Sequence, residues 1–161
     1  TDGSLDGQDA SCGLFSDGLQ IGFRLPKAFG TSSTTSELAG LLTAIHHHEP
    51  NTSLLVYVDS QAAIALTRKG LPSSRARLKN ANSDLVEAIQ VIASNHPAPI
   101  SVTWVKGHSG DVGNEEADRI ATETRRSDAS PMLPKIGTST QPRRKSSSGH
   151  TIFFSRCTLY V

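Results

Sequence analysis

The feature that most constrains the fold is the segment of residues 53–58, in which five of six side chains are apolar. A continuous apolar strand of this kind is typical of a sheet that is covered on both faces. The segment ends at Asp59-Ser60, where a polar side chain can cap the helix predicted over residues 61–68. It therefore favours a layered α/β protein with an acid at the end of a buried strand.

The other predicted elements fit the same architecture. Asp17-Gly18 predicts a hairpin turn between alternating strands. Apolar residues at helical spacing follow a polar loop, with Glu37 in the first turn of the helix. Trp104 lies near the end of a later strand and is expected to pack in the core. The predicted strands cover residues 12–16, 19–25, 53–58 and 100–105, and the predicted helices begin near residues 37, 61, 83 and 114. We therefore expect a mixed sheet with helices on its faces.

Charge divides the chain into two parts. Residues 1–126 hold 11 Lys and Arg against 14 Asp and Glu, whereas residues 127–161 hold 5 against 1. A simple electrostatic nucleic-acid binder should be basic throughout, so the acidic part argues against one and allows carboxylates gathered around cations. Residues 127–161 are also rich in Ser and Pro, which predicts a disordered tail. Within it, the apolar residues 151–154 fit either a stray strand or a non-native tail.

Four acids stand at predicted element boundaries or in the last helix: Asp2, Glu37, Asp59 and Asp118. If the strands that bear Asp2 and Asp59 are neighbours, the four carboxylates can converge. Such a cluster needs cations, and all-oxygen ligands favour Mg²⁺ or Mn²⁺. Alone, Asp59 can be a helix cap and Asp118 a solvated charge. The spacing by itself leaves nuclease, transferase and phosphatase functions open.

Five motifs resemble the ribonuclease H family (type I) in order and approximate spacing: Thr1-Asp2-Gly3-Ser4, Ser36-Glu37-Leu38, Val58-Asp59-Ser60, Trp104-Val105-Lys106-Gly107-His108-Ser109-Gly110 and Gly113-Asn114-Glu115-Glu116-Ala117-Asp118. The resemblance implies a ribonuclease H-like fold over residues 1–126, with a mixed five-stranded sheet and helices on both faces. The family's first strand precedes its Asp-Gly-Ser motif, so this strand is expected to be truncated. The style of the hairpin is most similar to ribonuclease H domains of retroelement reverse transcriptases.

The resemblance also implies the roles of individual residues. Asp2, Glu37, Asp59 and Asp118 match carboxylates that bind two Mg²⁺ ions, with Mn²⁺ as a substitute. His108 matches a loop histidine that assists proton transfer and product release.

Contacts with nucleic acid follow from the resemblance and from charge. Asn114 matches a contact to a DNA phosphate, and it can also cap the last helix. Residues 68–79 hold five bases and no acid, which indicates a phosphate-contacting loop, or else a solvated loop without contacts. Hydroxyls precede the helical Glu where many family members have amides, so they are candidates to bond the 2′-hydroxyl of RNA. The predicted nucleic-acid contacts are Gly3, Ser4, Ser33, Thr34, Arg75, Arg77, Lys79 and Asn114.

The predicted activity is metal-dependent hydrolysis of the RNA strand of an RNA/DNA hybrid. The alternative is a catalytically inactive retroelement remnant with a nucleic-acid-binding or structural role. A third reading is another nuclease or an integrase on the same fold. The predicted partners are the hybrid and a covalently linked reverse transcriptase domain. No apolar stretch is long enough to predict a membrane span, and the compartment is left open between cytoplasm and nucleus.

Overall fold

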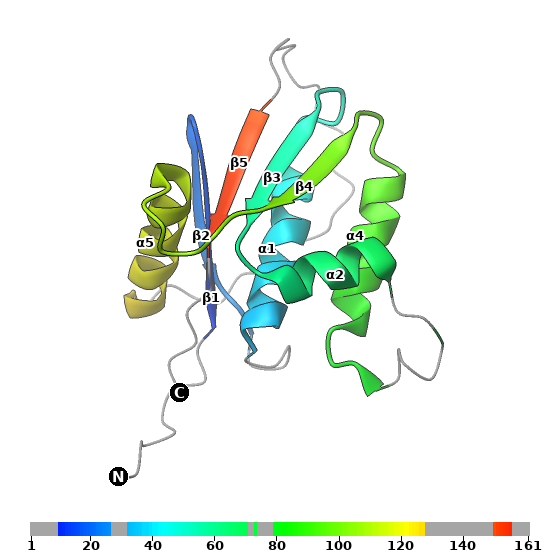
Figure 1. The fold of residues 1–161 in the computed structure, drawn as a ribbon, viewed down its shortest axis with the longest axis horizontal. Helices are drawn as coiled ribbons and strands as arrows, with labels where there is room; N and C mark the ends of the chain where they lie inside the picture. The colour runs from blue at the N-terminus through cyan, green and yellow to red at the C-terminus, as the bar shows by residue number, and fades with distance from the viewer. Residues whose placement is uncertain (1–9, 27–31, 71–72, 74–78, 128–149, 156–161) are drawn as a thin grey trace.

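The computed structural model describes residues 10–26, 32–70, 73, 79–127 and 150–155. These residues form a sheet with helices packed against it (Figure 1). Among them, no helix has the length and apolar character that crossing a membrane requires. The elements in chain order are β1 (Ser11–Ser16), β2 (Leu19–Arg24), α1 (Ser33–His47), β3 (Leu54–Val58), α2 (Gln61–Lys69), α4 (Ser83–Ser94), β4 (Ile100–Trp104), α5 (Val112–Arg126) and β5 (His150–Ser155).

The strands lie in the order β2-β1-β5-β3-β4. β1 and β2 form the predicted antiparallel hairpin, in which Ser16 pairs with Leu19 across the turn. Gly18 occupies that turn with a φ of 86°, a left-handed conformation that glycine adopts without steric cost. β3 is parallel to both of its neighbours, β4 and β5. The sheet is therefore mixed, as the sequence predicts.

The strand β5 changes the predicted division of the chain. It lies between β1 and β3 (Figure 1), although its residues belong to the range 127–161 that we predicted to be a disordered tail. Residues 150–155 are therefore not a disordered part of the range, and of the two alternatives for residues 151–154 the strand is the one observed. The predicted truncated first strand, at Thr1 and Asp2, lies outside the described residues.

Helices cover both faces of β1. Its side chains alternate between the faces, and those of Cys12 and Leu14 join the apolar core that includes α1. On the other face, the Ser11 hydroxyl donates to the Ala121 carbonyl of α5 at 2.7 Å. A Cβ built on Gly13 would collide with the α5 backbone, at 2.7 Å from Ala121 N and closer still to another backbone atom. Glycine thus lets α5 lie directly against β1.

The strand β3 is more deeply covered on one face than on the other. Leu54, Val56 and Val58 are at most 1% exposed, whereas the side chains between them are half-buried. The prediction of a strand that is covered on both faces therefore holds fully for one face and in part for the other. The chain leaves the sheet after Val58, so residue 59 lies at the carboxyl end of β3, where open α/β sheets place their ligand sites.

Candidate active site at the carboxyl end of β3

A cavity of about 280 Å³ opens beside the end of β3. Three elements contribute to it: the start of α1, the β3–α2 junction and the loop between β4 and α5. Its lining residues are Ser33, Glu37, Asp59, Ser60, Gly107 and His108. Four of these six, Ser33, Glu37, Asp59 and His108, are predicted site residues, and they lie far apart in the sequence.

Asp59 is held by backbone contacts on both sides. Ser60, not Asp59, caps α2, because the Ser60 hydroxyl accepts a hydrogen bond from Ala63 N at 3.2 Å. The indole Nε1 of Trp104 donates to the Asp59 carbonyl at 3.1 Å. A Cβ built on Gly107 would lie 2.7 Å from Asp59 Oδ2. The loop therefore reaches the Asp59 carboxylate because residue 107 has no side chain.

Trp104 corrects a sequence prediction. We expected this indole in the core, but it is 46% exposed. Trp104 is the last residue of β4, an edge strand in the described sheet, so no further strand covers it. Its Nε1–H also requires an acceptor, and the Asp59 carbonyl supplies one.

Glu37 lies in the second turn of α1, not in the first turn as predicted. The helix begins at Ser33, and the Ser32 hydroxyl caps it by accepting from Thr35 N at 3.0 Å. Thr35 in turn donates to Asn82 at 2.6 Å, which ties this end of α1 to the residue that precedes α4. Glu37 is 1% exposed and still lines the cavity. Because α1 begins earlier than predicted, Glu37 lies further from the N-terminus of the helix than the sequence suggested.

His108 stands at the solvent side of the cavity. It has a φ of 52°, and among the described residues it is the one non-glycine with a positive φ. In the same loop, the Ser109 hydroxyl donates to the Lys106 carbonyl at 2.6 Å. A left-handed histidine costs free energy unless its surroundings require it, and such residues are concentrated at functional sites. The exposed imidazole faces the same cavity as the two carboxylates.

The predicted site residues of α5 do not line this cavity. Asp111 caps the helix and accepts from Asn114 N at 3.0 Å, so Asn114 is not the cap that the sequence suggested. The Asn114 side chain is 2% exposed and its Oδ1 makes no hydrogen bond to the described residues. Asp118, one turn further along, is half-buried and does not line the cavity. A buried amide oxygen without a donor suits a place where a further group binds.

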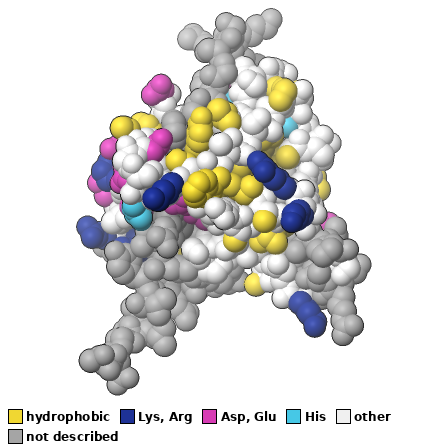
Figure 2. Space-filling view, viewed as in Figure 1, with side chains coloured by type: hydrophobic (Ala, Val, Ile, Leu, Met, Phe, Trp, Pro, Cys, Tyr) yellow, Lys and Arg dark blue, Asp and Glu magenta, His cyan; other side chains and the backbone are white. Residues whose placement is uncertain are grey.

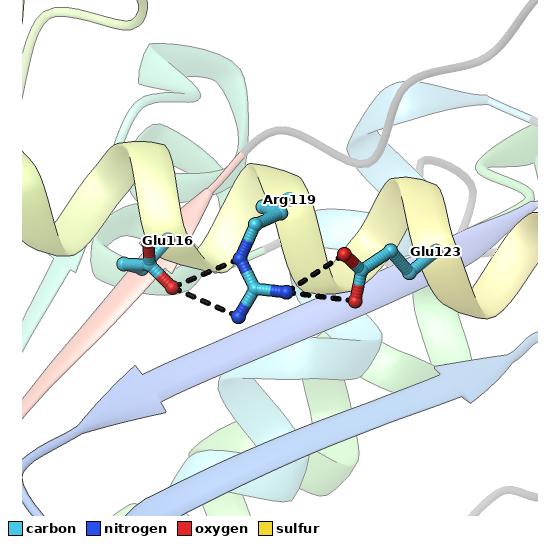
Figure 3. A network of polar contacts seen from close by, with 3 residues as sticks. All are labelled: Glu116, Arg119 and Glu123. Carbon is cyan, nitrogen blue, oxygen red and sulfur yellow. Dashed lines mark hydrogen bonds and ion pairs between the residues drawn. The ribbon is translucent and has the colours of Figure 1, made fainter.

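The outer face of α5 carries its own ion pairs (Figure 3). Arg119 donates to Glu116 Oε2 at 2.9 and 3.0 Å and to both oxygens of Glu123 at 2.7 and 2.8 Å. The hydrogen bond to Glu116 is the main cause that raises the pKa of Arg119, followed by the bond to Glu123. Both pairs are exposed and therefore stabilise the helix little. Arg119 is thus engaged by two carboxylates and is not among the candidate phosphate ligands.

The remaining predicted site residues divide into placed and unplaced ones. Thr34 is half-buried beside Ser33, which lines the cavity, and Lys79 is exposed. On the face of the molecule drawn in Figure 2, acidic side chains gather over the side where α5 lies, and basic side chains are scattered across the face. The other predicted residues lie outside the described part of the chain: Asp2, Gly3, Ser4, Arg75 and Arg77.

The sequence did not predict two of the lining residues or the hydrogen bond between Thr35 and Asn82. Ser60 and Gly107 line the cavity but were not predicted as site residues. Each adjoins a predicted site residue: Ser60 follows Asp59 after a buried strand, and Gly107 precedes His108. These local patterns could have indicated both lining residues. Nothing in the local sequence signals that Asn82 contacts Thr35, because the contact joins distant segments.

The donor set suits a hard cation in part. Glu37 and Asp59 bring carboxylates to one cavity, and Ser33 and Ser60 bring hydroxyls. Oxygen ligands of this type suit Mg²⁺ rather than zinc. Within the described ranges, however, no three His, Cys, Asp or Glu side chains lie close enough to hold a metal ion. The convergence of four carboxylates is therefore not shown, and two of them share the cavity.

A larger cavity among the described residues lies elsewhere. Its volume is about 1050 Å³, and it runs along β4 and the helices beside it. None of the predicted carboxylates lines it. Size alone is therefore a poor guide to the site here, whereas the smaller cavity collects the polar groups that converge from three elements.

Together, the fold and the smaller cavity define an α/β protein with an acidic, hydroxyl-lined site at the carboxyl end of parallel strands. Comparison with known proteins then gives the family. The model of the family described as RNase H matches residues 1–126, and the chain belongs to this family of ribonucleases.

Individual relatives agree with this assignment. The ribonuclease HI of Synechocystis sp. is 28% identical over 120 residues, which cover 67% of this chain and 71% of that protein. The ribonuclease H of Herminiimonas arsenicoxydans is 29% identical over 136 residues, covering 75% and 88%. The ribonuclease H of Verminephrobacter eiseniae is 31% identical over 105 residues, and this match spans 58% of the chain and 65% of the relative, slightly less than two thirds of its length.

Proposed function

We propose that this protein hydrolyses the RNA strand of RNA/DNA hybrids with the help of divalent cations. The observation that carries the proposal is that Glu37, Asp59 and His108 meet in one cavity although they come from three separate elements. The names of the relatives support the same activity, since all three are called ribonuclease H or HI.

In the proposed site, Glu37 and Asp59 would hold Mg²⁺ or Mn²⁺, and Asp2 and Asp118 are the two further proposed ligands. The ions would supply charge that stabilises the phosphoryl oxygens and activates water for attack. The chain's own contribution is to keep Asp59 fixed at the end of β3 through Ser60, Trp104 and Gly107.

The reaction adds water to the phosphorus and breaks its bond to the 3′-oxygen. The products are a 5′-phosphate on one fragment and a 3′-hydroxyl on the other. His108 lies at the solvent side of the cavity, where its imidazole can donate the proton that the leaving 3′-oxygen gains. Ser33 lines the same cavity, and its hydroxyl, with that of Thr34, can bond to the 2′-hydroxyl that distinguishes RNA from DNA.

The substrate side of the proposal combines described residues with others outside the described part of the chain. Asn114, Lys79, Arg75 and Arg77 are the proposed contacts to the DNA strand and the phosphates, with Gly3 and Ser4 beside Asp2. We also propose that a reverse transcriptase domain is covalently linked to this chain. The names of the three relatives do not refer to a reverse transcriptase, and reverse-transcriptase motifs in the same reading frame would support the link.

The test is a cleavage assay on one labelled sequence in three forms: RNA/DNA hybrid, double-stranded RNA and DNA duplex. We expect cleavage of the hybrid alone, at the RNA strand, in Mg²⁺ and not in EDTA. Product ends are assigned by their response to phosphatase and to a 3′-end ligase. If the protein binds the hybrid but no form is cleaved in Mg²⁺ or Mn²⁺, the inactive alternative is correct and the proposed activity is wrong.

A further inference from the structure

An aromatic side chain is exposed to solvent directly beside the candidate active site. Trp104 is 46% exposed, although a tryptophan side chain carries a large apolar area that favours burial. Its indole Nε1 lies 3.1 Å from the carbonyl oxygen of Asp59, a residue that lines the cavity. The exposed indole is therefore an immediate neighbour of the cavity.

Exposed hydrophobic side chains gather at the loop that follows β4. Among the described residues, the large hydrophobic side chains that are exposed are Val91, Trp104 and Val112. Trp104 precedes the loop of residues 105–111 and Val112 follows it, and part of this loop lines the cavity. In Figure 1 the loop runs from the end of β4 across the sheet to the start of α5. Two of these three side chains therefore flank one loop of the site.

The same loop carries a positive charge that is available to a ligand. Lys106 is exposed, and its ammonium makes no ion pair with the described residues. The acid of the loop, Asp111, caps α5 by accepting from Asn114 N at 3.0 Å. Lys106 adjoins Gly107, which lies against the Asp59 carboxylate. The Lys106 ammonium therefore lies within a side chain's length of the cavity.

A hybrid bound at the cavity has to cover this surface. Successive phosphates of one strand are about 3.4 Å apart along the axis of a duplex, so the nucleotides next to a phosphate in the cavity lie over the residues that border it. The faces of paired bases are closed by their neighbours in the stack. The indole therefore meets a sugar ring and the ammonium meets a phosphate, which are the groups that most protein contacts to a duplex use.

We propose that Trp104 and Lys106 bind the nucleic-acid backbone beside the scissile phosphate, with the indole packed on a sugar ring and the ammonium paired with a phosphate. The inference rests on the proposed function, because it takes the substrate of the cavity to be a hybrid. Such a contact carries no sequence information and holds the strand in register with Glu37 and Asp59. The indole then has two roles, since its N–H fixes Asp59 and its face binds the substrate.

Two substitutions separate these roles of the indole. Trp104→Phe and Trp104→Leu both remove the hydrogen bond to the Asp59 carbonyl, but only Trp104→Phe keeps an aromatic face. We expect KM for the labelled hybrid to be at least about fivefold higher in Trp104→Leu than in Trp104→Phe, with kcat equal within about twofold. Melting curves establish that both variants are folded. Equal KM values in the two folded variants would show that the indole acts only through Asp59.

The phosphate contact is tested through the salt dependence of binding. Binding of the hybrid is measured by anisotropy in the Asp59→Asn background, so that the hybrid stays intact. The matched control for Lys106→Ala is Arg126→Ala, because Arg126 is exposed at the far end of α5, about 20 Å along the helix from the loop. The slope of the logarithm of the binding constant against that of salt concentration should fall by about one unit in Lys106→Ala alone. An unchanged slope in Lys106→Ala would remove this lysine from the contact.

The fluorescence of Trp104 gives a measurement that is independent of cleavage. Because the chain has one tryptophan, its emission reports on this surface alone. We expect the emission to change saturably when the hybrid is added to Asp59→Asn, with a midpoint at least about threefold higher after Lys106→Ala.

The outcomes keep this contact apart from the proposed function. If anisotropy shows that the hybrid binds while the emission of Trp104 stays constant, the contact at the indole is wrong. If the emission titrates and Lys106→Ala lowers the salt slope, but the parent chain cleaves no hybrid in Mg²⁺ or Mn²⁺, the proposed function fails and the contact stands. If the hybrid does not bind even at low salt, both are wrong.

Discussion

Three neighbouring residues fix the position of Asp59. Its backbone is bonded by Trp104, its neighbour Ser60 caps α2, and Gly107 leaves room for its carboxylate. We expect Asp59→Asn to lower the hybrid cleavage rate by about a hundredfold or more, since an amide holds a divalent cation less well than a carboxylate does. The control is Asp84→Asn, an exposed acid in the first turn of α4, which should leave the rate unchanged. Near-normal cleavage by folded Asp59→Asn would remove Asp59 from the site.

The role of His108 can be distinguished from that of the carboxylates by measuring the turnover of a His108 variant. It is exposed at the edge of the cavity, so removing its side chain should leave the fold and cation binding intact. His108→Ala should lower kcat by at least about tenfold, because the leaving oxygen then takes its proton from water. His47→Ala, an exposed imidazole at the end of α1, is the matched control. An unchanged kcat in steady-state assays would count against a role in proton transfer.

Single residues differ in how far the sequence predicts them. Asp59 follows an apolar strand and His108 lies in a glycine-containing loop, and both patterns are local. Glu37 was predicted in the wrong turn because six consecutive hydroxyl residues, 31–36, can each cap a helix. The structure places the cap at Ser32, and Thr35 at this end of the helix contacts distant Asn82. The exposure of Trp104 depends on which strand lies at the edge of the sheet, and the local sequence does not encode this.

At the scale of elements, the contact between α5 and the hairpin depends on two glycines that face each other. Gly13 and Gly22 are cross-strand partners, and both approach α5. A Cβ at residue 13 would meet helix backbone, whereas one at residue 22 would meet the side chains of Thr124 and Ile120. Backbone cannot move without shifting the whole helix, but a side chain can rotate.

We therefore expect the two alanine variants to differ. Gly13→Ala should reduce the free energy of unfolding by about 2–3 kcal/mol, since overpacking forces the backbone apart. Gly22→Ala should reduce it by less than about 1 kcal/mol, because Thr124 can adopt another rotamer. Urea unfolding followed by circular dichroism measures both. Equal losses in the two variants would show that α5 does not lie against β1 as closely as described.

Elements were predicted well where the pattern is local and poorly where pairing is long-range. The helix α4 has the predicted limits, Ser83–Ser94, because its apolar residues recur at helical spacing and prolines at 97 and 99 follow its end. The strand β5 was not predicted as part of the sheet, since a short apolar segment after a polar stretch does not reveal which strands it pairs with. Its place follows only from the open edges of β1 and β3.

At the scale of the whole molecule, the proposed cation site links activity to stability. Carboxylates gathered in one cavity repel one another, and a divalent cation that binds only the folded state relieves this repulsion. Mg²⁺ at a hundred times its dissociation constant would add about 2.7 kcal/mol to the free energy of unfolding. The melting temperature should therefore rise with Mg²⁺ and return when EDTA is added.

The melting experiment is sharpest when it compares variants, because cations also bind weakly to any acidic surface. Asp59→Asn should lose most of the Mg²⁺-dependent rise, whereas Asp84→Asn should keep it. The single tryptophan, Trp104, reports the transition by fluorescence, since its indole is bonded to the Asp59 carbonyl. An equal rise in all three proteins would assign the effect to general surface binding and leave the cavity without a resident cation. A rise lost only in Asp59→Asn places the cation at the end of β3, independently of any cleavage assay.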